Sequence, residues 1–259
     1  MRLRVLGCHG GESPTHRTTS FLIDDNILLD AGAVSRGLSV GEQKAIDAVF
    51  ISHSHLDHIR DLALLSDNVI GQRRSPVEVY ATEPTASALE KHFFNNIIWP
   101  DFTKIPNPAD PERRPTVRIN RIRPFEETTV GELRFRTVPV NHPVDCQAYF
   151  VSGPTGTLVY SGDTGPTETL WDEINRVDDL RAFIYEVSFP NDMPALAEVS
   201  GHLTPLMMAE ELRKFRPLTR APILLYHLKP TFFDVLKREI EALGDARLQI
   251  LKPMDEFDL

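Results

Sequence analysis

Cysteine is scarce in this chain, and Cys8 and Cys146 are its 2 cysteines among 259 residues. Two cysteines cannot build a disulfide framework, so we expect both to be small core residues in a cytoplasmic protein. Long apolar runs are missing too, and none approaches the roughly 20 residues that a membrane-spanning helix needs. The first seven residues are too short in apolar length for a signal peptide, and we expect them to form the first strand.

Basic residues are outnumbered, with Lys and Arg at 28 against 37 Asp and Glu, which gives a net charge of −9. This balance argues against broad binding to nucleic acid, which relies on clustered Lys and Arg. It leaves room for a small phosphate ligand, because bound cations can dominate the local field. The one basic concentration consists of Arg113, Arg114, Arg118, Arg121 and Arg123. Within it, the alternation of Arg118, Arg121 and Arg123 predicts the solvent-facing side of an edge strand.

Apolar runs alternate with turn signals along the chain, and 41% of the residues are hydrophobic. We expect strands at about residues 3–6, 20–23, 27–29, 48–51, 118–123, 133–140, 148–151, 157–160, 182–187 and 222–226. We expect helices at about residues 61–65, 86–95 and 231–243, and after 165–166 and 204–205. Residues 100–116 are rich in proline and predict an irregular insertion. The order predicts two facing sheets with helices outside, in a single domain over residues 1–259.

The most informative segment is the run SHSHLDH at residues 52–58, just after the apolar stretch 48–51. It places three imidazoles and a carboxylate on one tight loop, and these groups together suit Zn²⁺, Fe or Mn²⁺. His53 and His55 alternate along an extended backbone and can face one ion. Asp57 and His58 follow the turn and can face a second. The loop therefore predicts the floor of a two-metal site.

Three later residues share one context, because each follows the end of an expected strand. They are His142, Asp163 and His227. Site residues collect on loops beyond the carboxyl ends of strands in α/β folds. Taken singly, each is better explained as a hydrogen-bonded loop residue. Beside the histidine loop, the three together are better explained as further metal ligands.

These residues resemble the metallo-β-lactamase superfamily, and the resemblance runs along nearly the whole chain. It implies an α/β fold, the αββα four-layer sandwich, with two divalent metal ions at the sheet edges. Zn²⁺ is the favoured metal, and Mn²⁺ or Fe also suits the ligands. The resemblance implies that His53, His55 and His142 hold one ion, that Asp57, His58 and His227 hold the other, and that Asp163 bridges them. Such a pair can share a hydroxide and clamp the attacking and leaving oxygens.

A second set of residues points to one branch of that superfamily. The segment SGDTGP at residues 161–166, then Glu186, then GHLT at residues 201–204 resembles its phosphodiesterases. That branch includes the tRNA 3′-processing endonucleases and the class II cyclic nucleotide phosphodiesterases. The resemblance implies that Glu186 keeps His202 protonated beside the scissile phosphate. The candidate catalytic residues are thus Asp57, Glu186 and His202. The competing interpretation of His202 is a helix-entry residue that binds backbone.

Two longer segments, residues 55–66 and 89–101, are similar to the class II cyclic nucleotide phosphodiesterases. The second contains Phe93, Phe94 and Trp99, which we expect in the core, with a purine-stacking face as the alternative. The family signature has Gly where this chain has Asp61, which bears on substrate fit. The basic arm of the tRNA enzymes is not recognisable. Lys229, two residues after His227, either touches a phosphate or has no specific role.

We therefore expect a dinuclear metal phosphodiesterase that converts 3′,5′-cyclic nucleotides such as cAMP or cGMP to 5′-monophosphates. A metal-bridging hydroxide would attack phosphorus, and the 3′ oxygen would leave. Two alternatives stay open: an RNA-processing nuclease of the same branch, and a non-catalytic metal protein that senses a nucleotide or oxygen. The expected partner is a small cyclic nucleotide, with nucleic acid and membrane disfavoured and a homodimer left open.

Overall fold

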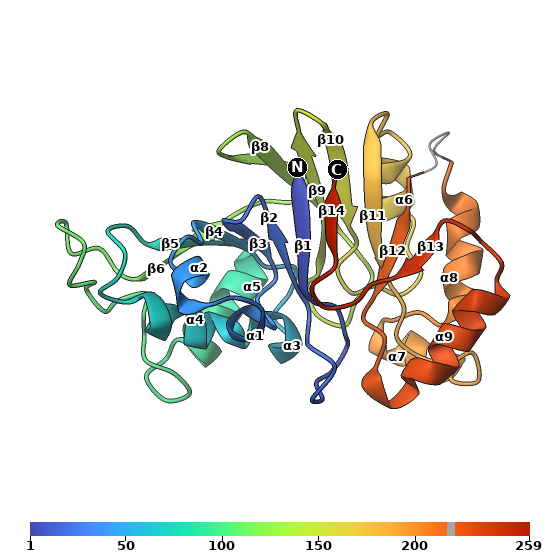
Figure 1. The fold of residues 1–259 in the computed structure, drawn as a ribbon, viewed down its shortest axis with the longest axis horizontal. Coiled ribbons are helices and arrows are strands. Elements are labelled where there is room, and N and C mark those ends of the chain that lie inside the picture. The colour runs from blue at the N-terminus through green and yellow to red at the C-terminus, as the bar shows by residue number, and fades with distance from the viewer. Residues whose placement is uncertain (217–220) are drawn as a thin grey trace.

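Two β-sheets form the centre of the molecule, and helices cover the outer face of each (Figure 1). The computed structural model describes residues 1–216 and 221–259. Within those ranges the first sheet has the order β14-β1-β2-β3-β4-β5-β6. Its strands are β1 (Arg2–Gly7), β2 (Ser20–Ile23), β3 (Ile27–Leu29), β4 (Ala48–Phe50), β5 (Val77–Ala81), β6 (Val117–Arg121) and β14 (Glu256–Asp258).

The second sheet comes mostly from the second half of the chain and has the order β13-β12-β11-β10-β9-β8-β7. Its strands are β7 (Glu127–Val130), β8 (Leu133–Pro139), β9 (Gln147–Gly153), β10 (Gly156–Tyr160), β11 (Leu180–Glu186), β12 (Ile223–Tyr226) and β13 (Leu248–Ile250). The strand β14 then returns to the first sheet and pairs with β1, so both chain ends lie side by side (Figure 1).

Helices of the first half pack on the first sheet, and helices of the second half pack on the second (Figure 1). The former are α1 (Val34–Gly37), α2 (Val40–Gln43), α3 (Leu56–Ile59), α4 (Asp61–Val69), α5 (Glu83–Ala88) and the π-helical turn η1 (Leu89–Phe93). The latter are α6 (Thr169–Ile174), α7 (Pro194–Ser200), α8 (Pro205–Glu211), η2 (Leu212–Lys214), η3 (Pro230–Phe232) and α9 (Phe233–Ala242).

Three separate apolar clusters show the layer order. One lies between the first sheet and its helices, and another lies between the second sheet and its helices. The third lies between the two sheets, where the rings of Phe50 and Phe135 stack with centroids 3.8 Å apart. Strands that are buried on both faces read as continuous apolar runs, which explains why they were recognisable in the sequence. The predicted αββα four-layer sandwich is confirmed.

Strand direction gathers the important loops at one edge. In the first sheet β3, β4, β5 and β6 run parallel, and in the second β10, β11, β12 and β13 run parallel. The strand β8 runs in the direction of β10, because both pair antiparallel with β9. The carboxyl ends of five strands therefore point to this edge, where residues from distant parts of the sequence can meet: β4, β8, β10, β11 and β12.

The segment around residues 83–99 differs from the expected single helix. The α5 helix ends at Ala88, a π-helical turn follows, and Ile97 is 86% exposed in a turn. Phe93 and Phe94 are buried in the core, and the partly buried Trp99 packs against the same cluster. The core interpretation is thus confirmed for Phe93 and Phe94, and Trp99 lies at the border of the same core cluster. Asn95 shapes the turn, since its side-chain oxygen accepts from the backbone N–H of Ile97.

Several short elements were absent from our sequence prediction. They include the strands β5, β7, β13 and β14 and the helices α1, α2 and α7. Except for β5 and α7, each is three or four residues long, which is too short for a periodic pattern. Between η1 and β6 the chain forms turns, with two isolated bridges that join Phe94 to Trp99 and Pro106 to Pro115.

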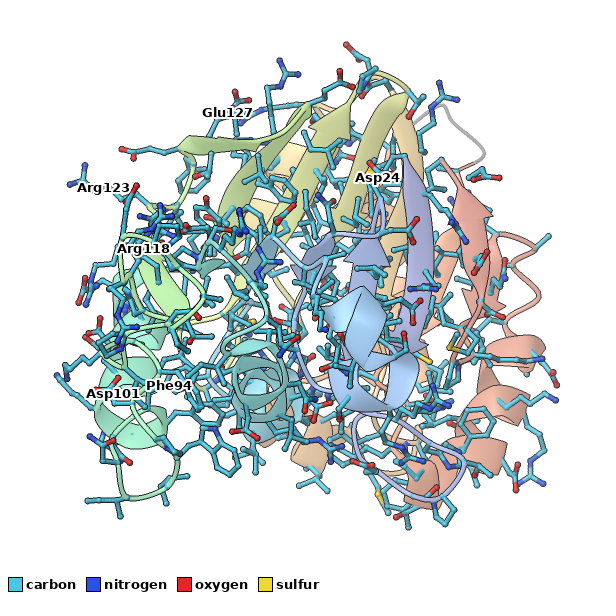
Figure 2. All side chains as sticks on the ribbon, turned by 60° about the vertical axis from the view of Figure 1, so that its left-hand side comes forward. Asp24, Phe94, Asp101, Arg118, Arg123 and Glu127 are labelled. Carbon is cyan, nitrogen blue, oxygen red and sulfur yellow. The ribbon has the colours of Figure 1, made fainter. Side chains whose placement is uncertain are left out.

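The basic residues near β6 lie at the margin of the first sheet, as predicted, and Figure 2 shows Arg118 and Arg123 there. Arg118 hydrogen-bonds with Glu78, and Arg121 pairs with Glu83 and Glu90 at 2.6 and 2.7 Å. Neighbouring carboxylates thus compensate these charges. Within the described residues, every helix falls short of the length and hydropathy of a membrane span.

Candidate metal centre

The histidine loop leaves β4 in an extended conformation and then turns into α3. His55 has φ −66° and ψ 146° and stands at the N-cap of that helix, whose first turn carries Asp57 and His58. His53 and His58 are fully buried. The alternation inferred from the sequence is therefore present: His53 and His55 belong to the extended part, and Asp57 and His58 lie past the turn.

The structure brings together all seven residues that the sequence analysis selected as ligands. Ligand atoms of His53, His55 and His142 lie within 4.8 Å of one another, and so do those of Asp57, His58 and His227. Asp163 stands between the two triads: its Oδ2 is 3.2 Å from His58 Nε2 and 3.0 Å from His227 Nε2. The same oxygen is 3.7 Å from His53 Nε2. We call these seven residues the candidate metal centre.

The donor atoms fit metal ions. The Nε2 atoms of His53 and His58 are buried and have no hydrogen-bond partner, which is costly unless a cation binds them. In four of the imidazoles the other ring nitrogen is already held, as is usual for metal-binding histidine. These contacts join His53 to Ser52 Oγ at 3.0 Å, His58 to Asp30 Oδ2 at 2.7 Å, His142 to the Gly201 carbonyl at 2.9 Å, and His227 to Ser188 Oγ at 2.8 Å.

Asp30 organises one side of the centre, although the sequence analysis did not select it. Its fully buried carboxylate accepts hydrogen bonds from the Ser52 backbone N–H, the Ser52 hydroxyl, His58 Nδ1 and the Tyr160 hydroxyl, at 2.6–2.7 Å. A signal was available, because Asp30 directly follows the strand β3. Accepting from Nδ1 fixes the His58 tautomer and leaves Nε2 for a metal ion.

Glu186 and His202 lie beside the centre. Glu186 Oε1 is 3.5 Å from His202 Nδ1, and the His202 ring stacks on His227 with centroids 5.0 Å apart. Ser188, which the sequence analysis missed, donates to Glu186 Oε2 at 2.8 Å. Because that hydroxyl proton is committed to Glu186, Ser188 Oγ accepts from His227 Nδ1. Glu186 is thus connected to a predicted metal ligand as well as to His202.

Buried charges set the protonation of the ligands. Burial lowers the pKa of His53 and brings that of His142 to about 4, so both are neutral and able to bind a metal ion. For His58 burial also opposes the charge, but Asp163, Asp30 and Asp57 outweigh it and raise its pKa well above the ordinary value. Without a metal ion, a proton on His58 Nε2 therefore supplies part of the positive charge that these carboxylates require, and an ion bound at Nε2 would replace that proton.

The Glu186–His202 pair differs from the expected carboxylate and imidazolium. Burial, followed by the charge of Asp163, raises the pKa of Glu186 to about 8. Burial lowers the pKa of His202. Both shifts favour the neutral pair, in which Glu186 carries the proton, because burial penalises the charged form of each group.

The structure explains the aspartate at position 61, where the family signature has Gly. The Asp61 carboxylate is buried and accepts from both the backbone N–H and the hydroxyl of Ser35, each at 2.7 Å. Its own N–H donates to Ala31 at 2.8 Å. Asp61 thus connects the start of α4 to α1. Its hydrogen bonds go to these residues and not to the candidate metal centre.

Three residues outside the candidate metal centre are Cys8, Cys146 and His9. Cys8 and Cys146 are free and buried, as predicted. His9 lies in the glycine-containing turn, where its Nδ1 contacts the Arg17 backbone.

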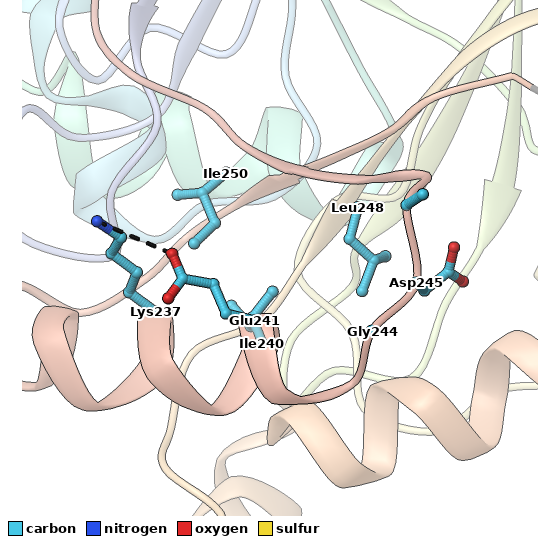
Figure 3. Close-up of a pocket in the computed structure, with 8 residues that line it drawn as sticks. Lys237, Ile240, Glu241, Gly244, Asp245, Leu248 and Ile250 are labelled. Carbon is cyan, nitrogen blue, oxygen red and sulfur yellow. Dashed lines mark ion pairs between the residues drawn. The ribbon is translucent and has the colours of Figure 1, made fainter.

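A hollow of about 450 Å³ between α9 and β13 contains none of the predicted site residues (Figure 3). Figure 3 shows that Lys237 and Glu241 form an ion pair there, at 3.9 Å.

The four layers and the histidine and aspartate cluster at the sheet edge define the αββα class of metallohydrolases. Residues 25–227 match the family model described as Beta-lactamase superfamily domain. The chain belongs to the metallo-β-lactamase superfamily.

Individual relatives extend over nearly the whole chain. A 3′,5′-cyclic-nucleotide phosphodiesterase of Aliivibrio fischeri is 30% identical, with 96% of this chain and 89% of that protein covered. The structure of unliganded yeast PDE1 has a TM-score of 0.78 at 19% identity, with 96% and 97% covered. The metallo-beta-lactamase fold protein YhfI of Bacillus subtilis has a TM-score of 0.74 at 21% identity, with 99% of both chains covered. These two structures share the fold of this chain.

Proposed function

We propose that this protein is a phosphodiesterase that hydrolyses 3′,5′-cyclic nucleotides such as cAMP or cGMP to 5′-monophosphates. We further propose that the candidate metal centre holds two divalent ions, with Zn²⁺ favoured by the histidine-rich ligand set. The Aliivibrio fischeri relative carries this activity in its name and supports the substrate class. The orphaned Nε2 atoms of His53 and His58 support the metal ions.

The single observation that carries the proposal is the position of the Glu186–His202 pair. The His202 ring lies 5.1 Å from the His142 ring and 5.0 Å from the His227 ring, between centroids. These two histidines belong to different triads, so His202 stands beside both proposed ions. An ester or lactone hydrolase with the same metal ligands has no need of a buried acid at this place.

The chemistry follows from the proton on the pair. When bound, the two metal ions supply an activated water and neutralise phosphate charge. His202 Nδ1 faces Glu186, which leaves Nε2 for the substrate. As the bond from phosphorus to the 3′ oxygen breaks, Nε2–H gives its proton to that oxygen, and Nδ1 takes the proton of Glu186. This transfer needs no buried imidazolium in the resting protein, which agrees with the lowered pKa of His202.

The test is product analysis with zinc-reconstituted protein. Cyclic AMP, cyclic GMP, bis(p-nitrophenyl) phosphate and a precursor tRNA are incubated separately, and products are separated by chromatography. We expect 5′-monophosphates from the cyclic nucleotides and an intact tRNA. Tight cyclic nucleotide binding without product would contradict the proposal and support a sensor. Cleavage of the tRNA without cyclic nucleotide turnover would support a nuclease.

The role of His202 has its own matched comparison. His202→Ala is expected to lower turnover by about 10²–10⁴-fold while the metal content, measured by inductively coupled plasma spectrometry, stays that of the wild type. His92 is an exposed histidine on η1, and His92→Ala serves as the control. Metal loss in His202→Ala would identify a ligand instead of a proton donor. Unchanged turnover would remove His202 from the mechanism.

A further inference from the structure

Lys229 places a cation at the edge of the candidate metal centre. It follows His227 by two residues in the loop beyond β12, and its Nζ donates to the Gly10 carbonyl at 3.4 Å. Gly10 in turn touches His227, because a Cβ at Gly10 would lie 2.7 Å from the His227 ring. The ammonium therefore bonds to a residue, Gly10, that itself packs against the predicted metal ligand His227.

An aromatic ring connects this cation to the proposed proton donor. Lys229 Nζ lies 5.1 Å from the centroid of the Phe189 ring, and that ring lies 5.8 Å from the His202 ring, between centroids. Phe189 is 6% exposed, so its position is fixed by packing.

The charge of Lys229 is not balanced by a carboxylate. Among residues 1–216 and 221–259, no acidic oxygen lies within 4.0 Å of its Nζ, whereas Lys214 pairs with Glu168 and Glu211. Lys229 is half-buried, and its ammonium has three N–H donors, of which Gly10 takes one. The contact with Phe189 compensates only part of the lost hydration. A half-buried cation with free donors is suited to an anionic ligand.

We propose that Lys229 binds an anionic oxygen of the phosphate group in the substrate and in the 5′-monophosphate product, an inference that rests on the proposed function. The competing explanation is structural: Lys229 would only anchor the Gly10 turn against His227. The two explanations predict different defects in a Lys229 variant. Loss of the anchor would affect the metal ion that His227 is proposed to hold, whereas loss of a phosphate ligand would leave that ion in place.

The experiment measures phosphate binding directly. Isothermal titration calorimetry is performed on zinc-loaded protein with inorganic phosphate and, separately, with 5′-AMP. Lys229→Met is expected to weaken both by roughly tenfold or more, as loss of a charge-assisted hydrogen bond implies, and to reduce the salt dependence. Lys229→Arg should retain most of the affinity. Lys237→Met is the control, because Lys237 is an exposed lysine that pairs with Glu241.

Each outcome decides between the explanations. Unchanged phosphate affinity in Lys229→Met overturns the inference, and so does a wild-type protein that binds neither phosphate nor 5′-AMP. Loss of metal from Lys229→Met shows anchoring instead of phosphate binding and also overturns it. In turnover of bis(p-nitrophenyl) phosphate, the inference requires a raised KM with kcat retained.

Failure of the proposed function is recognised separately. If cyclic nucleotides are not hydrolysed but phosphate affinity depends on Lys229, the anion site stands and the substrate assignment falls. If cyclic nucleotides are hydrolysed and phosphate affinity is independent of Lys229, the substrate assignment stands and the anion site falls.

Discussion

Tyr226 donates its hydroxyl proton to Oδ1 of Asp163 at 2.9 Å, although the two residues belong to different strand ends. This bond occupies one carboxylate oxygen and leaves Oδ2 toward His58 and His227. The residue after Tyr226 is His227 itself, so one strand end positions both a proposed ligand and the partner of the proposed bridging carboxylate.

Tyr226→Phe should therefore weaken metal binding without displacing a ligand. Removing a hydrogen bond to a charged group costs about 1.5–3 kcal/mol, and outer partners of metal ligands typically contribute 10–100-fold in affinity. We expect a loss of about tenfold in zinc affinity, measured by competition with a chelating dye. Equal affinities in variant and wild type would show that the hydroxyl does not hold Asp163.

Asp30 should matter for stability even when no metal is bound. Asp30→Ala leaves the buried donors of Ser52, His58 and Tyr160 without their acceptor. We expect the free energy of unfolding to fall by about 3–5 kcal/mol, as for other broken buried polar networks. Urea unfolding in EDTA measures this loss apart from metal binding. Asp30→Asn keeps the shape and one acceptor, and should lose less.

Gly10 should be required by the close approach of His227 and not by its own backbone conformation. A Cβ at Gly10 would lie 2.6 Å from the His227 carbonyl oxygen, whereas a Cβ at Gly11 would meet only Pro230, at 3.2 Å. We expect Gly10→Ala to displace His227 and to reduce bound zinc from two ions toward one per chain, by elemental analysis. Gly11→Ala is the matched control. Two tightly bound ions in Gly10→Ala would refute this role.

Acid should remove the contribution of Asp101 to the free energy of unfolding. Asp101 lies in the turn segment after η1. Burial opposes its charge, but hydrogen bonds from Lys104 and Thr103 outweigh burial and lower its pKa. A lowered pKa stabilises the folded state above the unfolded pKa of about 3.9, and this contribution is lost as the pH falls through the folded value.

The measurement for Asp101 compares urea unfolding of wild type and Asp101→Asn in EDTA, near neutral pH and below about pH 4. Near neutral pH the wild type should be the more stable protein, and the difference should shrink in acid. A difference that is independent of pH would show that the charge of Asp101 is not what stabilises the turn.

The residues of the candidate metal centre could be selected from the sequence because the strongest evidence for them is local. His53, His55, Asp57 and His58 lie on one loop, so a single strand end brings them together. His142, Asp163 and His227 were recognisable because each follows a strand. Asp30 has the same context and was missed, since one carboxylate after a strand is common and nothing near it in sequence suggests a metal.

Other features depended on contacts between distant segments. Ser188 connects Glu186 to His227 across 39 residues of chain, and no local pattern encodes such a bond. The irregular course of residues 83–99 was also missed, because helical spacing alone does not show where η1 turns out of the α-helix. Tertiary packing overrides local propensity at such places.

By itself, the sequence determined the alternation of strands and helices, the residues available as proposed ligands and the strand ends that carry them, because strand and loop patterns are short-range. The αββα arrangement was implied by the family resemblance. Only the tertiary structure decided that Asp163 stands between two triads, that burial raises the pKa of Glu186 beside His202, and that Lys229 has no acidic partner among the described residues. The physical reason is burial: protonation and charge balance depend on which distant groups exclude water around a side chain, and that is settled only when the sheets close on each other.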